Sequence, residues 1–174
     1  MAVRYTSDVE RRHKEGLAAT THVSIYSYTD RVARGVIKSM LDKKEIPFCG
    51  FDQMILIIEE ILDREEILKN AFEYRYIDRS FQYESWLEQT AQPQIRGFSQ
   101  NFLIRVYGRL NRSMQGEMRV KDKQCYFRSG MELMRFMHQW LQIESRKLEN
   151  ADKGEASPLL EHIGFAEYNE REDR

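Results

Sequence analysis

The amino-acid sequence predicts an all-α protein, a helical bundle of about five main helices in a single domain over residues 1–174. Three observations favour this class. Apolar residues recur at helical spacing in several stretches, helix-capping signals precede those stretches, and proline or glycine follows them. The 174 residues, of which 41% are hydrophobic, are enough for one core. One short β-hairpin near residues 118–127 is the exception that the pattern allows.

The N-terminal region predicts one short helix and then an ambiguous stretch. Ser7 to Glu10 fits the S-x-x-E capping box, so a helix is expected to begin there and to end near Gly16. Residues 17–28 are rich in Thr, Ser and β-branched side chains with a loose alternation of polarity. Loop, strand and the start of a helix remain open for them.

The next helix is expected to begin at Thr29 or Asp30, both good N-cap residues, and to run through Leu41. Its apolar residues recur on one face, and three cations cluster on the opposite side: Arg31, Arg34 and Lys38. A solvated surface is the simplest explanation of such a stripe. Binding of a polyanion is the alternative.

The middle of the chain predicts a central core helix. Asp52 is expected to cap a helix over Gln53 to Phe72, whose first turn is apolar all round. Six aromatic residues follow in residues 72–86, which we interpret as core rather than as a platform for stacked bases. Ser80 can cap a further helix that ends at Ala91, before a proline.

Residues 96–128 form a basic block, with eight Lys or Arg against two acids in a chain of net charge −1. Wound as a helix over 98–114, this block places its apolar residues on one face. Arg105, Arg109 and Arg112 then line a different flank. A row of guanidinium groups beside a buried helix face can grip a phosphate backbone.

The end of the basic block, residues 118–127, is expected to form either a short hairpin or a loop, and carries three more cations: Arg119, Lys121 and Lys123. Ser129 to Glu132 is another capping box, which predicts a long helix to about Asn150. Residues 152–174 are expected to form a polar linker, a short helix over Pro158 to Ile163 and a frayed tail over 167–174.

The sequence contains no catalytic or metal-binding motif, so we expect neither an enzyme nor a cofactor. Its four histidines lack metal-ligand spacing, and we expect His138 to be structural. The one arrangement worth weighing is Glu65 with Glu144, each on the apolar face of its helix. If those faces meet, one carboxyl pKa rises enough for general acid chemistry. Pairing with an arginine, or a place at the edge of a face, is the simpler alternative.

Charge alternates along the chain: +3 over residues 1–51, −6 over 52–95, +6 over 96–128 and −4 over 129–174. Such blocks either pair within the fold or form two functional faces of opposite sign. We find no internal repeat and no apolar run of membrane-spanning length. The N-terminus lacks a secretory apolar region, and two distant cysteines are typical of a reducing compartment, so we expect a cytoplasmic protein.

The function that these patterns favour is non-catalytic binding of a nucleic-acid backbone, DNA or RNA, without sequence readout. The candidate contacts are Arg31, Arg34, Lys38, Arg105, Arg109, Arg112, Arg119, Lys121 and Lys123. With its size, its helical character and these two stripes, the chain resembles the small subunit of CRISPR effector complexes of the Cascade type. That resemblance implies a helical subunit of a ribonucleoprotein complex in antiviral defence, several copies of which stabilise the R-loop.

The alternative is a helical protein–protein interaction or adaptor module. In that case the acidic helix 52–72 and the basic block satisfy each other, within one copy or between copies that associate head to tail. The two hypotheses differ in where the arginines lie. Exposure of the arginine row on one surface favours nucleic acid, whereas burial against the acids of 52–72 favours the interaction module.

Overall fold

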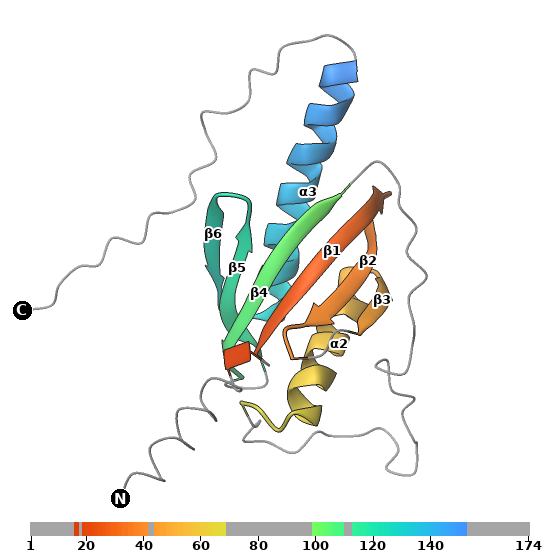
Figure 1. The fold of residues 1–174 in the computed structure, drawn as a ribbon. Coiled ribbons are helices and arrows are strands. Elements are labelled where there is room, and N and C mark those ends of the chain that lie inside the picture. Colours follow the sequence, from red (N-terminus) through yellow and green to blue (C-terminus); the bar gives the residue numbers. More distant parts are fainter. Residues whose placement is uncertain (1–15, 18, 42–43, 69–98, 110–112, 153–174) are drawn as a thin grey trace, which may run out of the picture.

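The computed structural model describes residues 16–17, 19–41, 44–68, 99–109 and 113–152. Over these residues the protein is mostly antiparallel β-sheet, so the predicted all-α bundle is wrong. One sheet has the strand order β3-β2-β1-β4-β5-β6, and two helices pack on it (Figure 1). Along the chain, three strands precede each of the two helices.

The elements follow one another as strands and helices in two similar series. The first series is β1 (Thr20–Thr29), β2 (Val32–Ser39), β3 (Glu45–Cys49) and α2 (Phe51–Arg64). The second is β4 (Gln100–Gly108), β5 (Gln115–Val120), β6 (Lys123–Phe127) and α3 (Gly130–Asp152). All neighbouring strands run antiparallel, and β1 pairs with β4 at the centre of the sheet.

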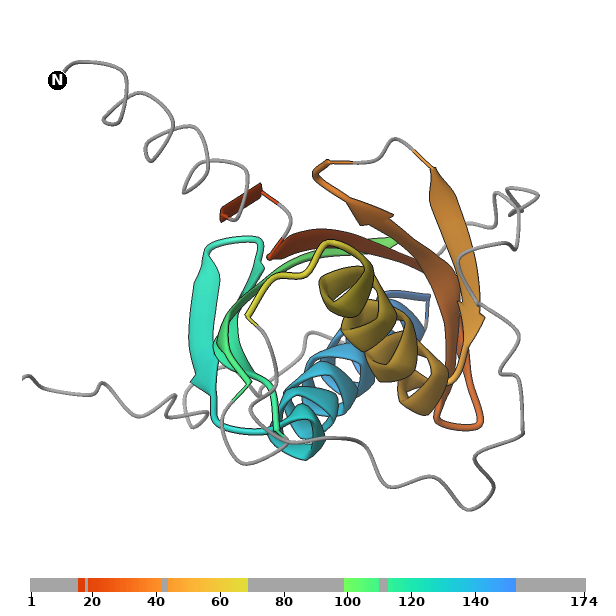
Figure 2. The ribbon, with the colours of Figure 1, turned by 90° about the horizontal axis from the view of Figure 1, so that it is seen from below.

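Both helices lie on the same side of the curved sheet, which we call the inner face (Figure 2). Alternate strand residues such as Val23, Ile104 and Met118 point to this side and are buried with Met54 of α2 and Leu133 of α3. The core therefore lies between the sheet and the helices. We call the opposite side the outer face; apart from the short helical stretch of Gly16 and Leu17, which lies next to Arg105, no described helix or strand covers it.

Within the stretch expected to be the basic helix, 98–114, residues 100–108 form the strand β4. Phe102, Ile104 and Val106 are buried while the residues between them are not, which is the period of two of a half-buried strand. The same apolar residues also satisfy helical spacing, so periodicity alone does not separate the two structures. The stretch forms a strand because it pairs with β1 on one side and with β5 on the other.

The helix expected over 29–41 is also wrong, because this stretch is a hairpin. Asp30 and Arg31 have positive φ angles of 52° and 63° and form the two-residue turn between β1 and β2. Two consecutive positive φ angles define the turn that best matches the twist of a hairpin. The ambiguous residues 17–28 accordingly belong mostly to β1.

Two local predictions are confirmed, and one alternative that the sequence left open is decided. The core helix exists as α2, although it ends at Arg64 and begins after Gly50, whose φ is 92°, so Asp52 lies in its first turn rather than at its cap. The Ser129 capping box opens α3, where the Ser129 hydroxyl accepts the Glu132 N–H at 3.1 Å. The hairpin of 118–127 is β5 and β6. Of the helix expected over 7–16, only Gly16 is described, and it is helical. The helices expected over 80–91 and 158–163, the aromatic cluster of 72–86, the linker after Asp152 and the tail lie outside the described residues.

The two halves of the described chain repeat one β-β-β-α unit. The strand order is symmetric about the β1–β4 pair, which indicates an approximate two-fold relation between the units. Each unit has an irregularity at the same place, between Ile25 and Ser27 in β1 and between Val106 and Gly108 in β4. The sequence did not indicate this repeat because few residue types are shared between the two units.

One glycine in each unit shows how close the match is. A Cβ atom at Gly35 would collide with the backbone oxygen of Ser24 and lie 2.9 Å from the ring of Phe48. At Gly116 it would collide with the backbone oxygen of Arg105 and likewise lie 2.9 Å from a phenylalanine ring, that of Phe127. The pairs Gly35 with Gly116 and Phe48 with Phe127 therefore occupy equivalent places, and glycine is required at both close approaches.

Candidate binding surface on the outer face of the sheet

Four of the predicted contact residues lie together on the outer face. Arg34 and Lys38 come from β2, Arg105 from β4 and Arg119 from β5. In each strand the residues next to them point to the inner face and are buried. The strands therefore bring these cations to one side of the sheet, although not through the helical stripes that the sequence predicted.

Arg109 does not belong to this surface. Its side chain is only 3% exposed, its Nη2 lies 2.5 Å from the Asp63 carboxylate, and its Nε donates to the backbone oxygen of Leu68 at 2.9 Å. This ion pair joins the basic block to the acidic block inside the fold. The row of Arg105, Arg109 and Arg112 is therefore not a single row, since two of its members lie in different environments and Arg112 lies outside the described residues.

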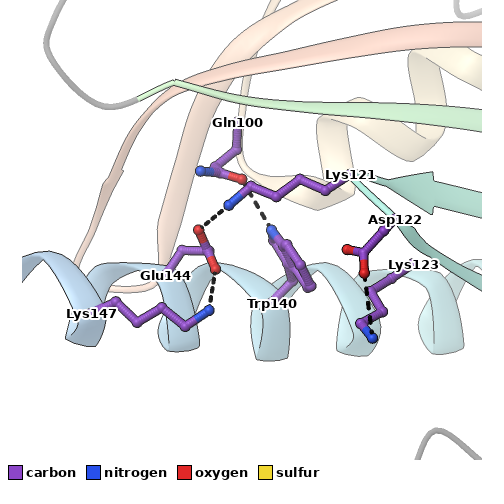
Figure 3. Close-up of polar contacts among 7 residues, drawn as sticks. All are labelled: Gln100, Lys121, Asp122, Lys123, Trp140, Glu144 and Lys147. Carbon is purple, nitrogen blue, oxygen red and sulfur yellow. Dashed lines mark hydrogen bonds and ion pairs between the residues drawn. The ribbon is translucent and has the colours of Figure 1, made fainter. Parts of the chain in front are cut away.

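Lys121 is used to hold the β5–β6 turn against α3 (Figure 3). Its ammonium group lies 2.5 Å from the Glu144 carboxylate and 5.5 Å from the centre of the Trp140 ring. Glu144 also accepts a hydrogen bond from Lys147 at 2.8 Å, and the Trp140 indole donates to Gln100 at 3.1 Å. This cluster stabilises the packing of α3 on the sheet.

The same cluster argues against the expected general acid. Burial alone would raise the pKa of Glu144, but the hydrogen bonds and the positive charges of Lys121 and Lys147 outweigh it and lower that pKa. The carboxylate is thus held ionised, whereas a general acid at neutral pH needs a raised pKa. Glu65, the expected partner in this site, follows the last residue of α2 at its C-cap.

The remaining predicted cations lie in turns. Lys123 lies 3.7 Å from Asp122 at the β5–β6 turn, with both side chains largely exposed. Arg31 occupies the β1–β2 turn. His138 of α3 makes a hydrogen bond of 3.0 Å with the Tyr28 hydroxyl. The pKa of this histidine is lowered, mainly by burial and also by the positive charge of Arg31. This contact is structural in character, because it joins α3 to β1.

Around Arg105 and Arg119 the outer face carries a polar cluster centred on a carboxylate. We call it the outer-face cluster; its members are Arg105, Tyr107, Glu117, Arg119, Gln124 and Tyr126. The Glu117 side chain is only 5% exposed although it lies on the uncovered side of the sheet. It binds the Arg119 guanidinium at 3.0 Å and accepts a hydrogen bond from the Gln124 amide at 2.7 Å. The same amide donates to the Tyr126 hydroxyl at 3.0 Å.

Two exposed tyrosines flank this carboxylate. Tyr107 is 48% and Tyr126 is 64% exposed, which is unusual for large aromatic side chains on a sheet. The Arg105 guanidinium lies 5.5 Å from the centre of the Tyr107 ring. The pKa of Tyr107 is raised to about 12, mainly by burial and then by a hydrogen bond with Glu117 and the negative charge of that residue. The Tyr107 phenol therefore remains a neutral hydrogen-bonding group at physiological pH.

The repeat provides an internal comparison for this cluster. The cross-strand row Arg105, Glu117 and Tyr126 of the second unit corresponds to the row Ser24, Val36 and Pro47 of the first. Similarly, Arg119 and Gln124 correspond to Lys38 and Glu45, and Tyr107 to Tyr26. The same fold is built in the first unit without a central carboxylate, a paired arginine or the second tyrosine. The repeated architecture by itself therefore does not dictate these residues.

The sequence pattern did not single out the two tyrosines, Glu117 or Gln124. A signal was present in the alternation of polar and apolar residues through 117–120, which continues only loosely through 123–127 and places alternate polar side chains on one face of a hairpin. The helix interpretation of 98–114 concealed the third strand of that face. Only the cations of the surface were predicted.

The fold and this surface define a class, an antiparallel sheet built from two β-β-β-α units with both helices on one face. Comparisons with protein-family models, with curated proteins and with solved structures find no match. No helix of the described part is long and apolar enough to cross a membrane. Within the same residues, His, Cys, Asp and Glu side chains form no group of three that could hold a metal ion.

Proposed function

We propose that this chain is a non-catalytic binding domain whose outer-face cluster binds a partner protein. The observation that carries the proposal is the difference between the two units. The second unit places arginine, tyrosine and a buried carboxylate where the first has Ser24, Val36 and Pro47. The repeated architecture does not dictate these residues, and no described strand covers the face that carries them, which supports a role in recognition.

The chemistry of the cluster is that of a protein-binding hot spot. Tyrosine and arginine are the residues most enriched where truncation costs most binding energy. Glu117 holds Arg119 and Gln124 in place, so these side chains lose little conformational entropy when a partner binds. The tyrosine rings offer apolar area together with hydroxyl groups. The negative charge of Glu117 at the centre of the cluster repels anions, so the cluster is not a simple anion-binding site.

The internal ion pairs support the same proposal over polyanion binding. Arg109 with Asp63 and Lys121 with Glu144 join basic residues to acidic segments within one copy. This is the arrangement expected of the interaction module, in which the charge blocks satisfy each other. We infer a cytoplasmic adaptor or a subunit of a larger complex, since both described cysteines are free thiols.

The test is affinity capture from cells with matched variants of the two units. The binding variant carries Arg105→Ala, Tyr107→Ala and Tyr126→Ala. The control carries two of the equivalent changes, Ser24→Ala and Tyr26→Ala, and keeps Pro47 on the β3 edge. A protein captured by the wild-type chain and the control should fall by about tenfold or more with the binding variant, because removal of each hot-spot residue costs upward of about 1 kcal/mol. Equal capture by both variants would overturn the proposal.

Binding of a nucleic-acid backbone stays as the second candidate, because Arg34, Lys38, Arg105 and Arg119 share one face. The resemblance to a Cascade-type small subunit belongs with this candidate, although the helical character on which it rests is absent from the described fold. Two of these cations have acidic neighbours: Arg119 pairs with Glu117, and Lys38 lies opposite Glu45 in the sheet. These acidic neighbours weaken the electrostatic attraction of the two cations for a phosphate group.

A salt series with a labelled single strand and a duplex separates the two candidates. If the outer face grips phosphates, changing its four cations to alanine should reduce the slope of log K against log salt by about 0.7–0.9 for each phosphate that is no longer neutralised. Arg109 should be left intact in this variant because it is part of the buried ion pair. No binding at low salt would leave the protein partner as the function of this face.

A further inference from the structure

The two edges of the sheet occupy equivalent places in the repeat but differ in chemistry. The β3 edge carries Pro47 in its middle, and the β6 edge carries Tyr126 at the equivalent position. Proline has no N–H and is a common means of preventing a further strand from adding to an edge. The β6 edge has no such protection, and no described element lies beyond it (Figure 1).

The hydrogen-bond pattern of the hairpin shows which groups of β6 face outward. Val120 and Lys123 flank the two-residue turn and form a hydrogen-bonded pair. Such pairs alternate with non-hydrogen-bonded pairs along antiparallel strands. The backbone N–H and C=O groups of Gln124 and Tyr126 therefore point away from β5, towards the open edge. Pro47 removes the equivalent outward N–H from β3.

We propose that a second copy of this chain pairs with the β6 edge, antiparallel and with the two-fold axis at Cys125. In this register Gln124 of one copy lies opposite Tyr126 of the other, and each such pair exchanges both backbone hydrogen bonds. The contact is isologous, so the two identical edges complete each other. The two six-stranded sheets become one continuous sheet, with both outer-face clusters on the same side of it.

Charge complementarity selects this occupant and this register. The same register brings Asp122, in the turn just before β6, near Arg128, just after β6, of the second copy, once at each end of the paired strands. These side chains are 78% and 89% exposed. Among the described residues of one copy, their ion pairs are long, Asp122 to Lys123 at 3.7 Å and Arg128 to Glu132 at 3.6 Å. A register shifted along the strand separates both matched pairs.

The experiment is sedimentation equilibrium of the purified full chain over about a hundredfold range of concentration, which spans a weak dimer. The wild-type chain should form a reversible dimer. Tyr126→Pro copies the protection of β3 and should raise the dimer dissociation constant about tenfold or more, since it deletes one outward N–H from each copy. Tyr126→Ala removes the ring but keeps the N–H, so it should still dimerise.

Charge reversal provides a second readout that does not depend on the folding of the proline variant. Asp122→Arg and Arg128→Asp should each weaken the dimer, and the double variant should restore it. A wild-type chain that stays monomeric at every concentration would overturn the proposal. So would equal dimerisation of Tyr126→Pro and Tyr126→Ala, or a double variant no better than the single ones.

The dimer is independent of the function proposed for the outer face. The variant Arg105→Ala, Tyr107→Ala, Tyr126→Ala keeps every backbone group of β6 and should lose its partner while it still dimerises. A chain that captures its partner but is monomeric would refute the edge pairing alone.

Discussion

Alanine at Gly116 is the most direct perturbation of the repeated architecture. Its Cβ would overlap the backbone oxygen of Arg105 in the neighbouring strand, and a backbone atom cannot move aside by a change of rotamer. Overpacking of this kind costs about 1–3 kcal/mol, and the loss of chain entropy in the unfolded state returns about 0.4–1 kcal/mol. We expect a net loss of about 1–2 kcal/mol in the free energy of unfolding, and the same for Gly35→Ala.

The measurement is urea unfolding followed by circular dichroism, with Gly108→Ala as the matched control. Gly108 lies in the same sheet, but a Cβ there has as its nearest atom the Gln115 amide oxygen at 3.8 Å, an ordinary contact. The control should therefore stay within about 0.5 kcal/mol of the wild-type chain. Gly116→Ala with the stability of Gly108→Ala would refute the close approach of β4 and β5, and a large loss at Gly116 alone would refute the equivalence of the units.

Three further predictions concern the ion pairs and thiols. Asp63→Ala should destabilise the protein by about 1–3 kcal/mol in denaturant unfolding and more than Arg109→Met, because it leaves a buried guanidinium unpaired; the reverse order would contradict the pairing. Because folding lowers the pKa of Glu144, this carboxylate stabilises the protein at pH values above the usual carboxyl pKa, and the stabilisation is lost as pH falls through the pKa of the folded state. The difference in free energy of unfolding between wild type and Glu144→Gln should therefore shrink on acidification. A difference that grows would contradict the ion pairs of Glu144. Burial, and to a lesser extent the charge of Glu132, raises the pKa of the Cys125 thiol to about 11. Iodoacetamide at about pH 8 should therefore label the exposed Cys49 and spare Cys125 in the native chain. Mass spectrometry of the labelled chain shows which cysteine has reacted, and labelling of Cys125 would contradict the prediction.

The elements that the sequence predicted correctly are those with strong local signals. The Ser129 capping box and the long amphipathic run behind it define α3, and a dense apolar segment defines α2. The hairpin of β5 and β6 was one of two alternatives that the sequence left open for 118–127, the other being a loop. Each of these signals lies within a short window of sequence, where propensity and pattern agree.

The strands of the sheet centre escaped prediction because their apolar residues satisfy two periods at once. In 100–108 the spacing of Phe102, Ile104 and Val106 alternates, yet a helix through the same stretch also gathers apolar residues on one face. One of the two partners that decide the matter, β1, lies far from β4 along the chain. A pairing that depends on distant segments is not visible in a local window.

The candidate surface was predicted in part. Four cations assigned to a common function do lie on one face, but they are brought there by a sheet rather than by two helices. The ion pair of Arg109 with Asp63 depends on packing between segments far apart in sequence, so the exposure of the arginine row was not predictable. The importance of Glu117 follows only from its burial among cross-strand neighbours.

Hydroxyl-radical footprinting tests the central proposal, that the outer-face cluster is the binding surface, and it works before the partner has been identified. Oxidation of Tyr107 and Tyr126 would be measured by mass spectrometry in the purified chain and in the chain held in its native extract, with Tyr26 as the equivalent residue of the first unit. We predict that the extract protects the two tyrosines of the second unit and leaves Tyr26 as reactive as before. Unchanged oxidation of Tyr107 and Tyr126 in the extract, or equal protection of Tyr26, would contradict it.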